Sequence, residues 1–319
     1  MTRFQALIVC LLCSYLLPAQ QLPLFTQYRE NIGILNPAAL SMDFLVHENN
    51  ISFGASYRRQ WVGFDSAPKT QVIHGEYVYA ESSSVGLIAG GHLINDQTGP
   101  TGFTGLYGRI AGIISDDVYE SGIIGGLSLG VVQYRVNVSD ITFREGGDIL
   151  TTEDQSQIYP DVGVGVYYYQ RLNMDGFLDD SQFYAGLSIP QIIGLDLEFQ
   201  DVDGNFYTKR VQHYYGFIGL YKYLSEDSFL EPSVWVKYTQ NVPVNIDFNL
   251  RYQMSGGFWL GAGGSTAATV HLESGIVLGE NSGMENHLRI GYGFDYSFRS
   301  FGPFAGTSHE LSVAYSFGN

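Results

Sequence analysis

The sequence predicts an all-β fold, a transmembrane antiparallel β-barrel of the outer membrane with about 14 strands. Three observations predict it. Apolar and polar residues alternate with a period of two from about residue 50 to the C-terminus, an export signal precedes that pattern, and no later stretch approaches the roughly 20 apolar residues that a membrane helix needs. The composition, with 39 Gly, 23 Tyr and 20 Phe, also favours strands and tight turns over long helices.

The net charge of the chain disfavours nucleic acid as a partner. The sequence holds 16 Lys and Arg against 32 Asp and Glu, a formal net charge of −16 at pH 7. Such an acidic chain repels phosphate backbones instead of neutralising them. With 319 residues the chain is also long enough to bury a large core without disulfide support. We therefore expect no nucleic-acid partner.

Residues 1–20 are predicted to be a cleaved secretory signal peptide. Arg3 precedes an apolar run over 6–17 that is shorter than a membrane helix. Both cysteines, Cys10 and Cys13, lie inside this leader, so the mature chain would hold no disulfide and no thiolate metal site. The rival interpretations are a first transmembrane helix and lipid attachment at one of the two cysteines.

Residues 21–49 are predicted to form an N-terminal segment, periplasmic or plug-like, ahead of a barrel domain at 50–319. Phe25, Tyr28 and Ile32 make this segment too apolar for a solvated linker. We expect it to pack into the barrel or against a periplasmic partner.

The strand prediction rests on segments such as 244–253, where apolar residues occupy every second position and polar residues occupy the positions between them. A helix would mix these two sets of side chains on one face, so the pattern favours strands. Similar runs are bounded by clusters of Gly, Pro, Asn, Asp or Ser. The predicted strands span 50–58, 69–79, 84–94, 101–114, 119–136, 159–170, 181–189, 210–223, 228–239, 243–253, 256–264, 268–279, 285–298 and 307–317.

The lengths of these strands favour a membrane barrel over a soluble sandwich. Many reach the roughly 9 to 11 residues that a tilted strand needs to cross a bilayer. Aromatic residues at strand ends, such as Trp61, Tyr79, Tyr223 and Phe317, suit the aromatic girdles of an outer-membrane barrel. The apolar face would then contact outer-membrane lipid, and the polar face would line the lumen.

An even number of strands places both termini in the periplasm and the first connection, 59–68, outside. Long connections near 137–158 and 190–209 then also face outside, while short turns at 81–83 and 225–227 fall on the periplasmic side, as is usual for such barrels. The connection at 171–180 is longer than this pattern predicts.

The sequence predicts no catalytic residues, no metal ligands and no cofactor. The seven histidines are scattered singly over different strands and loops. Asp201, Asp203 and Gly204 lack the spacing of a calcium loop, and the glycine-rich stretch 261–266 lacks the lysine of a phosphate loop. A barrel hydrolase whose catalytic residues come from distant strands stays open as an alternative.

Two N-terminal segments, FTQYRENIGILNPAALS at 25–41 and SYRRQWVGFDSAPKTQ at 56–71, resemble the opening of the PorP/SprF family of type IX secretion system outer-membrane proteins. Further resembling segments follow in the family's order at 94–108, 127–137, 159–169, 183–191 and in the closing SHELSVAYSF. The resemblance therefore extends over essentially the whole mature chain. One departure is that Ala39-Leu40-Ser41 follow Asn36-Pro37-Ala38, where the family commonly has an aromatic residue and a glycine.

The resemblance implies a non-enzymatic outer-membrane component of the type IX secretion and gliding machinery. Such proteins are expected to bind a large secreted adhesin through its C-terminal domain and to help export it or anchor it at the cell surface. Periplasmic components of the machinery are further expected partners. An outer-membrane porin or a lipid-type transporter is the alternative, because about fourteen strands can enclose a lumen.

The long outward connections and the first strand end indicate where a partner would bind. The candidate partner-binding residues are Arg58, Arg59, Gln60, Trp61, Phe64, Asp65, Glu145, Asp148, Glu153, Asp154, Asp201 and Asp203. Arginines beside Trp61 suit a carboxylate partner, and the acidic connections suit the basic edges of a cargo domain. Alternatively, Trp61 and Phe64 fold over the barrel mouth while the arginines pair with lumen acids such as Glu76.

Overall fold

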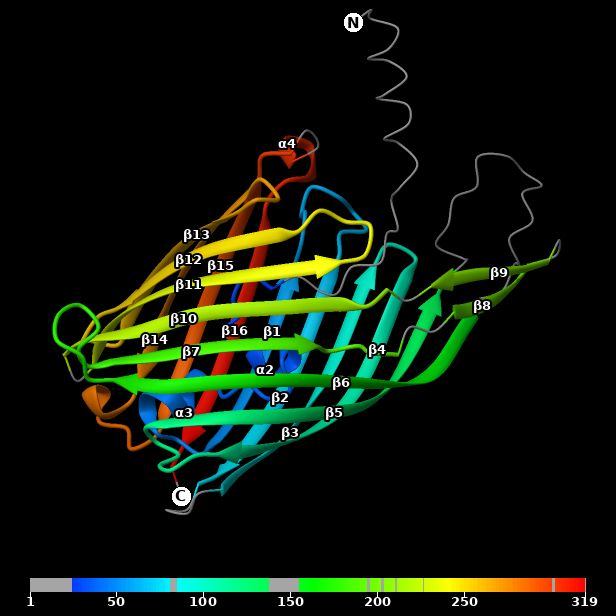
Figure 1. Ribbon diagram of the computed structural model, residues 1–319. Coiled ribbons are helices and arrows are strands. Elements are labelled where there is room, and N and C mark those ends of the chain that lie inside the picture. Colours follow the sequence, from blue (N-terminus) through cyan, green and yellow to red (C-terminus); the bar gives the residue numbers. More distant parts are fainter. Residues whose placement is uncertain are drawn as a thin grey trace, which may run out of the picture.

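The computed structural model describes residues 25–80, 85–137, 155–193, 196–201, 204–209, 211–225, 227–299 and 302–318, with the backbone alone over 196–201 and 204–209. Within these residues, fourteen antiparallel strands close into a barrel, as the alternation predicts (Figure 1). The barrel strands are β1 (Ile51–Arg59), β2 (Lys69–Tyr79), β3 (Val85–Thr98), β4 (Thr101–Ile114), β5 (Ser121–Val136), β6 (Gln155–Leu172), β7 (Ser181–Ile189), β10 (His213–Ser225), β11 (Ser228–Thr239), β12 (Asn245–Gln253), β13 (Phe258–Ser265), β14 (Thr269–Leu278), β15 (His287–Ser297) and β16 (Ser308–Phe317).

The barrel closes between its first and last strands. β1 pairs with β16 in antiparallel register from Ile51 opposite Phe317 to Arg59 opposite His309, and every other barrel strand pairs with its neighbours along the chain. Closure matters because an open sheet edge would leave backbone N–H and C=O groups unpaired in lipid.

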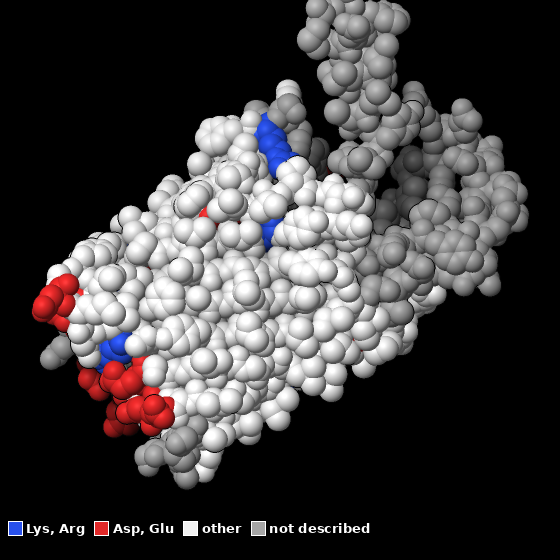
Figure 2. Space-filling model, viewed as in Figure 1, with Lys and Arg blue, Asp and Glu red and all other residues white. Residues whose placement is uncertain are grey.

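Alternation along each strand sorts the side chains between lipid and lumen. In β12, Asp247 and Arg251 are buried inside, whereas Phe248 and Leu250 are about half exposed on the outer face. The wall between the two ends of the barrel accordingly shows few charged side chains (Figure 2). This outer belt is the surface that hydrocarbon would cover.

The two ends of the barrel differ in their connections. We call the end at which β1, β5, β7 and β15 finish, where the connections 60–68, 137–154, 190–212 and 298–307 begin, the long-loop mouth, and the end at which β16 finishes the C-terminal mouth. The turns 115–120, 173–180, 226–227, 254–257 and 279–286 lie at the C-terminal mouth. The connection 279–286 includes the short helix η3 (Glu280–Ser282), and α4 (Gly302–Ala305) lies at the long-loop mouth.

The connection at 190–209 holds two strands that were not among the predicted ones, because β8 (Asp196–Asp201) and β9 (Gly204–Lys209) pair as a separate two-stranded sheet within it. The expectation that both ends of the chain face the periplasm is wrong for the described residues, whose two ends lie at opposite mouths. Phe25 shares a cavity with Ile94 and Phe103 near the long-loop mouth, whereas Phe317 ends the last strand at the other.

The topology predicts how cysteine substitutions at the two mouths will label. In a background with Cys10 and Cys13 changed to serine, a membrane-impermeant maleimide should label Asp65→Cys in intact cells, because residue 65 is exposed at the long-loop mouth. Asp116→Cys, exposed on a turn at the C-terminal mouth, should label only after the outer membrane is permeabilised. Equal labelling of both variants in intact cells would show that the assigned orientation is incorrect.

Candidate functional site

Residues 25–49 fill the lumen, and we call them the plug. They include α2 (Ile32–Leu35) and α3 (Met42–His47), which Figure 1 shows inside the barrel. The plug starts near the long-loop mouth at Phe25 and ends near the C-terminal mouth, where the Asn49 amide donates to the Ser316 hydroxyl at 3.0 Å. Its apolar side chains, such as Leu35 and Phe44, are buried. The division of the chain into a plug and a barrel domain remains our prediction.

Charged side chains tie the plug to the barrel wall. Arg29 pairs with Glu231 of β11 at 2.6 Å and with Glu273 of β14 at 3.0 Å. Glu30 and Asp43 converge on Arg289 of β15, at 2.8 and 2.6 Å. All of these side chains are nearly inaccessible to solvent. A charge left unpaired in such a place is costly, so each partner depends on the other.

A second charged cluster joins the start of the plug to the seam of the barrel. Arg58 of β1 pairs with Asp295 of β15 at 2.6 Å and with Glu310 of β16 at 3.4 Å. Thr26 binds the same two acids, since its backbone N–H donates to Glu310 and its hydroxyl donates to Asp295, both at 2.6 Å. The plug, β1 and the last two strands therefore share one polar network.

This buried, charged environment shifts the pKa values of titratable groups in the plug. Burial raises the pKa of Asp43, but the Arg289 guanidinium, together with His47 and the Ser316 hydroxyl, lowers it, and the net pKa lies below its ordinary value. Burial and the charge of His287 lower the pKa of His47 to about 3. His47 is therefore neutral at pH 7, and its ring stacks on that of His287 with centroids 4.3 Å apart.

The Asn36-Pro37-Ala38 turn sits in a niche made by glycines. The Asn36 amide donates to the carbonyl oxygens of Val166 on β6 and Leu187 on β7, at 3.0 and 3.4 Å. Inward-facing glycines of β5, β6 and β7 make room for it. They are Gly126, Gly165 and Gly186, at each of which a Cβ would collide with the Asn36–Ala38 turn.

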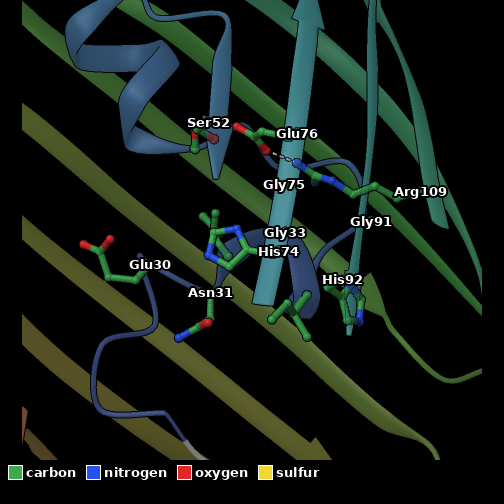
Figure 3. Close-up of a pocket in the computed structure, with 13 residues that line it drawn as sticks. Glu30, Asn31, Gly33, Ser52, His74, Gly75, Glu76, Gly91, His92 and Arg109 are labelled. Carbon is green, nitrogen blue, oxygen red and sulfur yellow. Dashed lines mark hydrogen bonds and ion pairs between the residues drawn. The ribbon is translucent and has the colours of Figure 1, made fainter. Parts of the chain in front are cut away.

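A basic wall residue completes this niche. Arg109 of β4 donates to the carbonyl oxygens of Pro37 and Ala39, at 3.3 and 2.9 Å, and pairs with Glu76 of β2. The same arginine borders a polar cavity between the plug and β1–β4, where His74, Glu76 and His92 also lie (Figure 3). The cavity measures about 20 Å³, which is room for a water molecule and too little for an organic ligand.

Aromatic side chains fill the opposite side of the lumen. Phe217 stacks on Trp235 with ring centroids 4.4 Å apart, and Trp235 stacks on Tyr28 of the plug at 5.2 Å. Tyr167 and Tyr184 extend this cluster along β6 and β7. The cavity beside Phe25 measures only about 30 Å³. Over the described residues, the lumen is thus packed rather than open.

The structure separates the residues that the sequence analysis assigned to partner binding. Arg58 is buried and faces the lumen; Glu76, the acid suggested for it, pairs with Arg109 instead. Arg59, Gln60 and Trp61 are partly exposed at the long-loop mouth, whereas Phe64 and Asp65 are exposed. The acids Glu145, Asp148, Glu153, Asp154 and Asp203 lie outside the described residues, and Asp201 ends β8.

The first connection lies against the last one at the long-loop mouth. The backbone N–H groups of Val62 and Gly63 donate to the carbonyl oxygens of Thr307 and Ala305, both at 2.9 Å. The backbone N–H of Trp61 donates to the Ser308 hydroxyl at 3.2 Å. A Cβ at position 63 would lie 2.8 Å from the Ala305 oxygen, so the close approach needs a glycine there. Part of the mouth is thereby covered.

The first and last connections carry exposed residues, of which the sequence analysis identified Phe64 alone. Phe304 of α4 is 79% exposed, Phe298 is 63% exposed and Phe64 is 48% exposed, with the exposed Arg299 between them in sequence. We call these four residues the mouth patch. Basic side chains are visible beside the position of α4 (Figure 2). The sequence analysis ended a strand at residue 298 and assigned no role to 299–306; the three phenylalanines of SFRSFGPFAG were the available signal.

Neither a metal-ligand cluster nor a membrane-spanning helix occurs in the described part of the chain. No group of three or more His, Cys, Asp or Glu side chains there could hold a metal ion. Nor is any helix among the described residues long and apolar enough to cross a membrane.

Comparison with known proteins identifies relatives by sequence and by fold. The profile of the family described as type IX secretion system membrane protein PorP/SprF matches residues 17–315. No curated protein matches the chain.

Three solved outer-membrane barrels show a similar fold. A Pseudomonas aeruginosa FadL homologue has 8% identity and a TM-score of 0.53, with 94% of this chain and 95% of that one covered. The Ralstonia pickettii toluene transporter TbuX has 10% identity and a TM-score of 0.52, with 90% and 93% covered. The P. putida toluene transporter TodX has 10% identity and a TM-score of 0.51, with 85% and 90% covered. The chain is an integral outer-membrane barrel.

Breaking the plug's ion pairs should destabilise the protein strongly. Arg289→Met leaves Asp43 buried without its cation and Glu30 with the more distant Arg251 at 3.7 Å, so we expect a loss of about 3 to 5 kcal/mol in the free energy of unfolding. The control Arg171→Met removes an exposed pair with Asp180 and should cost about 1 kcal/mol or less. Urea unfolding in detergent measures both losses. Equal losses would contradict the central role of the plug pairs.

Crowding the glycine niche should loosen the plug without opening the barrel. In Gly165→Ala the new methyl group would overlap the Asn36 side chain, so we expect a loss of about 1 to 3 kcal/mol and faster proteolysis within 25–49. The control Gly125→Ala faces outward with no atom within 4 Å of its Cβ and should change stability by about 0.5 kcal/mol or less. Identical cleavage rates in the two variants would argue against the niche.

Proposed function

The chain belongs to the PorP/SprF family of type IX secretion system membrane proteins, and from this premise we propose that it is a non-enzymatic component that holds a secreted, C-terminally tagged protein at the long-loop mouth. One observation carries the proposal: the described lumen is packed by the plug and by aromatic side chains, while the long-loop mouth exposes the mouth patch. Such a molecule is suited to binding at its end rather than to conduction.

The orientation of the barrel supports a surface location for this mouth. Outer-membrane barrels place their longer connections outside and their shorter turns in the periplasm. The strands β5 and β7, which the long connections 137–154 and 190–212 follow, both end at the long-loop mouth. A partner retained there would therefore face the cell exterior.

The chemistry of the mouth patch suits an apolar segment that carries a carboxylate. Phe64 and Phe304 offer exposed rings of the kind that dominate protein interfaces. Arg299 lies on the last connection and the partly exposed Arg59 ends β1 beside the first one, and both can bind a carboxylate or a terminal carboxyl group. The acids of the longer connections, from Glu145 to Asp203, would add contacts to basic edges of the cargo. Arg58 contributes indirectly, because it fixes the seam beneath the patch.

Diffusion through the barrel is the competing function. It would require the plug to leave a lumen in which Arg29, Glu30 and Asp43 are paired and buried. Planar-bilayer recording of the purified protein distinguishes the two functions, because a holding protein with this plug should give no steady conductance.

Deleting the gene should lower the amount of at least one C-terminally tagged protein at the cell surface. A Phe64→Ser, Phe304→Ser variant should reproduce that loss, because removing interface anchors costs about 2 kcal/mol or more, roughly thirtyfold in affinity. Phe248→Leu, on the lipid-facing belt, is the matched control and should retain the cargo. Surface and medium proteomes measure the outcome. If every tagged protein kept its wild-type level in the deletion strain, the function would have to be rejected.

A further inference from the structure

A turn at the C-terminal mouth exposes apolar side chains to solvent. The connection 173–180 joins β6 to β7, and in it Met174 is 54% exposed, Phe177 is 65% exposed and Leu178 is 39% exposed. These residues lie beyond the strand ends, in a turn longer than the usual periplasmic connection. Three large apolar side chains in one exposed turn mark a contact surface rather than scattered surface hydrophobics.

Neighbouring elements hold this turn in place. The backbone N–H of Arg171 donates to the Glu120 carbonyl oxygen on the adjacent turn at 2.6 Å. The Tyr223 N–H of β10 donates to the Asp180 carbonyl oxygen at 3.2 Å, and the Lys222 ammonium group donates to the Asp179 carbonyl oxygen. The apolar side chains are therefore presented on a supported turn between 115–120 and the end of β10.

Exposed carboxylates surround the turn, and the acidic end of the barrel is plain in Figure 2. Among the described residues, the exposed acids of the C-terminal mouth are Glu48, Asp116, Asp117, Glu120, Asp175, Asp179, Asp180, Asp227, Glu280 and Glu285. The cations of the described rim are Arg171, which pairs with Asp180, and Lys222. The apolar turn thus sits in a strongly negative field.

The apolar turn and its acidic rim together indicate the chemistry of the partner. An apolar centre with a charged rim is the usual anatomy of a protein interface. Anionic lipid headgroups would be repelled by this rim, which disfavours the turn as a membrane anchor. A protein with a basic surface around an apolar pocket complements both features.

We propose that Met174, Phe177 and Leu178, with the acidic rim around them, form a docking surface for a basic periplasmic protein. The surface lies at the opposite mouth from the mouth patch, so this inference stands independently of cargo retention there. The partner would contact the barrel from the periplasm while the long-loop mouth stays free.

Photo-crosslinking in intact cells tests the proposal. Benzoylphenylalanine in place of Phe177 should give an adduct with a periplasmic protein, identifiable by mass spectrometry, whereas the same probe in place of Phe248 on the lipid-facing belt should not. Neutralising the rim with Asp116→Asn, Asp175→Asn and Asp179→Asn should lower the yield of that adduct at least tenfold. None of these three carboxylates makes a hydrogen bond or ion pair in the described structure, so the barrel should fold, which its anomalous gel migration before heating will verify.

Binding of the identified protein to the purified full-length barrel in detergent then tests the chemistry. The dissociation constant should rise at least tenfold between 50 and 300 mM salt, as is typical of charge-steered contacts. Phe177→Ser should weaken binding about tenfold. Adducts to lipid alone, no adduct, or a protein adduct whose yield and salt dependence survive neutralisation of the rim would each overturn the proposal.

Discussion

The structure depends on the pairing of buried charges between the plug and the barrel wall. A barrel in a membrane must turn its apolar side chains outward, so its polar side chains are forced into a narrow interior. There, Arg29, Glu30 and Asp43 supply partners for Glu231, Glu273 and Arg289, which would otherwise face one another or water. The plug thus supplies the oppositely charged partners of these wall residues.

Charge pairing alone would not fix the position of the plug along the lumen. The glycine niche adds that specificity, because three neighbouring strands each have a glycine where the Asn36 turn approaches the backbones of β6 and β7. Ion pairs and niche act on different parts of the segment. Together they leave the mouths, rather than the interior, as the surfaces on which partners can act.

The barrel could be predicted from the sequence, because the cue for a strand is local. Alternation of the kind seen around Asp247 and Arg251 can be recognised within a single segment. The observed strand ends lie close to the predicted ones. The partner of Arg58 could not be found this way, since Asp295 and Glu310 meet it only after closure sets the register. The hairpin at 196–209 was missed although its sequence held a signal, since Leu197 and Phe199 alternate with polar residues and Asp203-Gly204 suits a tight turn. The exposure of Phe298 and Phe304 could not be predicted, because it depends on the tertiary structure around them.

The route of the plug has a consequence for how the chain is assembled. The segment precedes β1, yet Thr26 bonds to Glu310, 284 residues away, and Arg29 to Glu273, 244 residues away. Contacts of such long sequence separation form late and slowly. The segment made first must therefore wait for the strands made last, and the seam between β1 and β16 cannot be completed around it until both are present. A chain that lacked its final strands would thus leave Thr26 without the Glu310 carboxylate and Arg29 without that of Glu273.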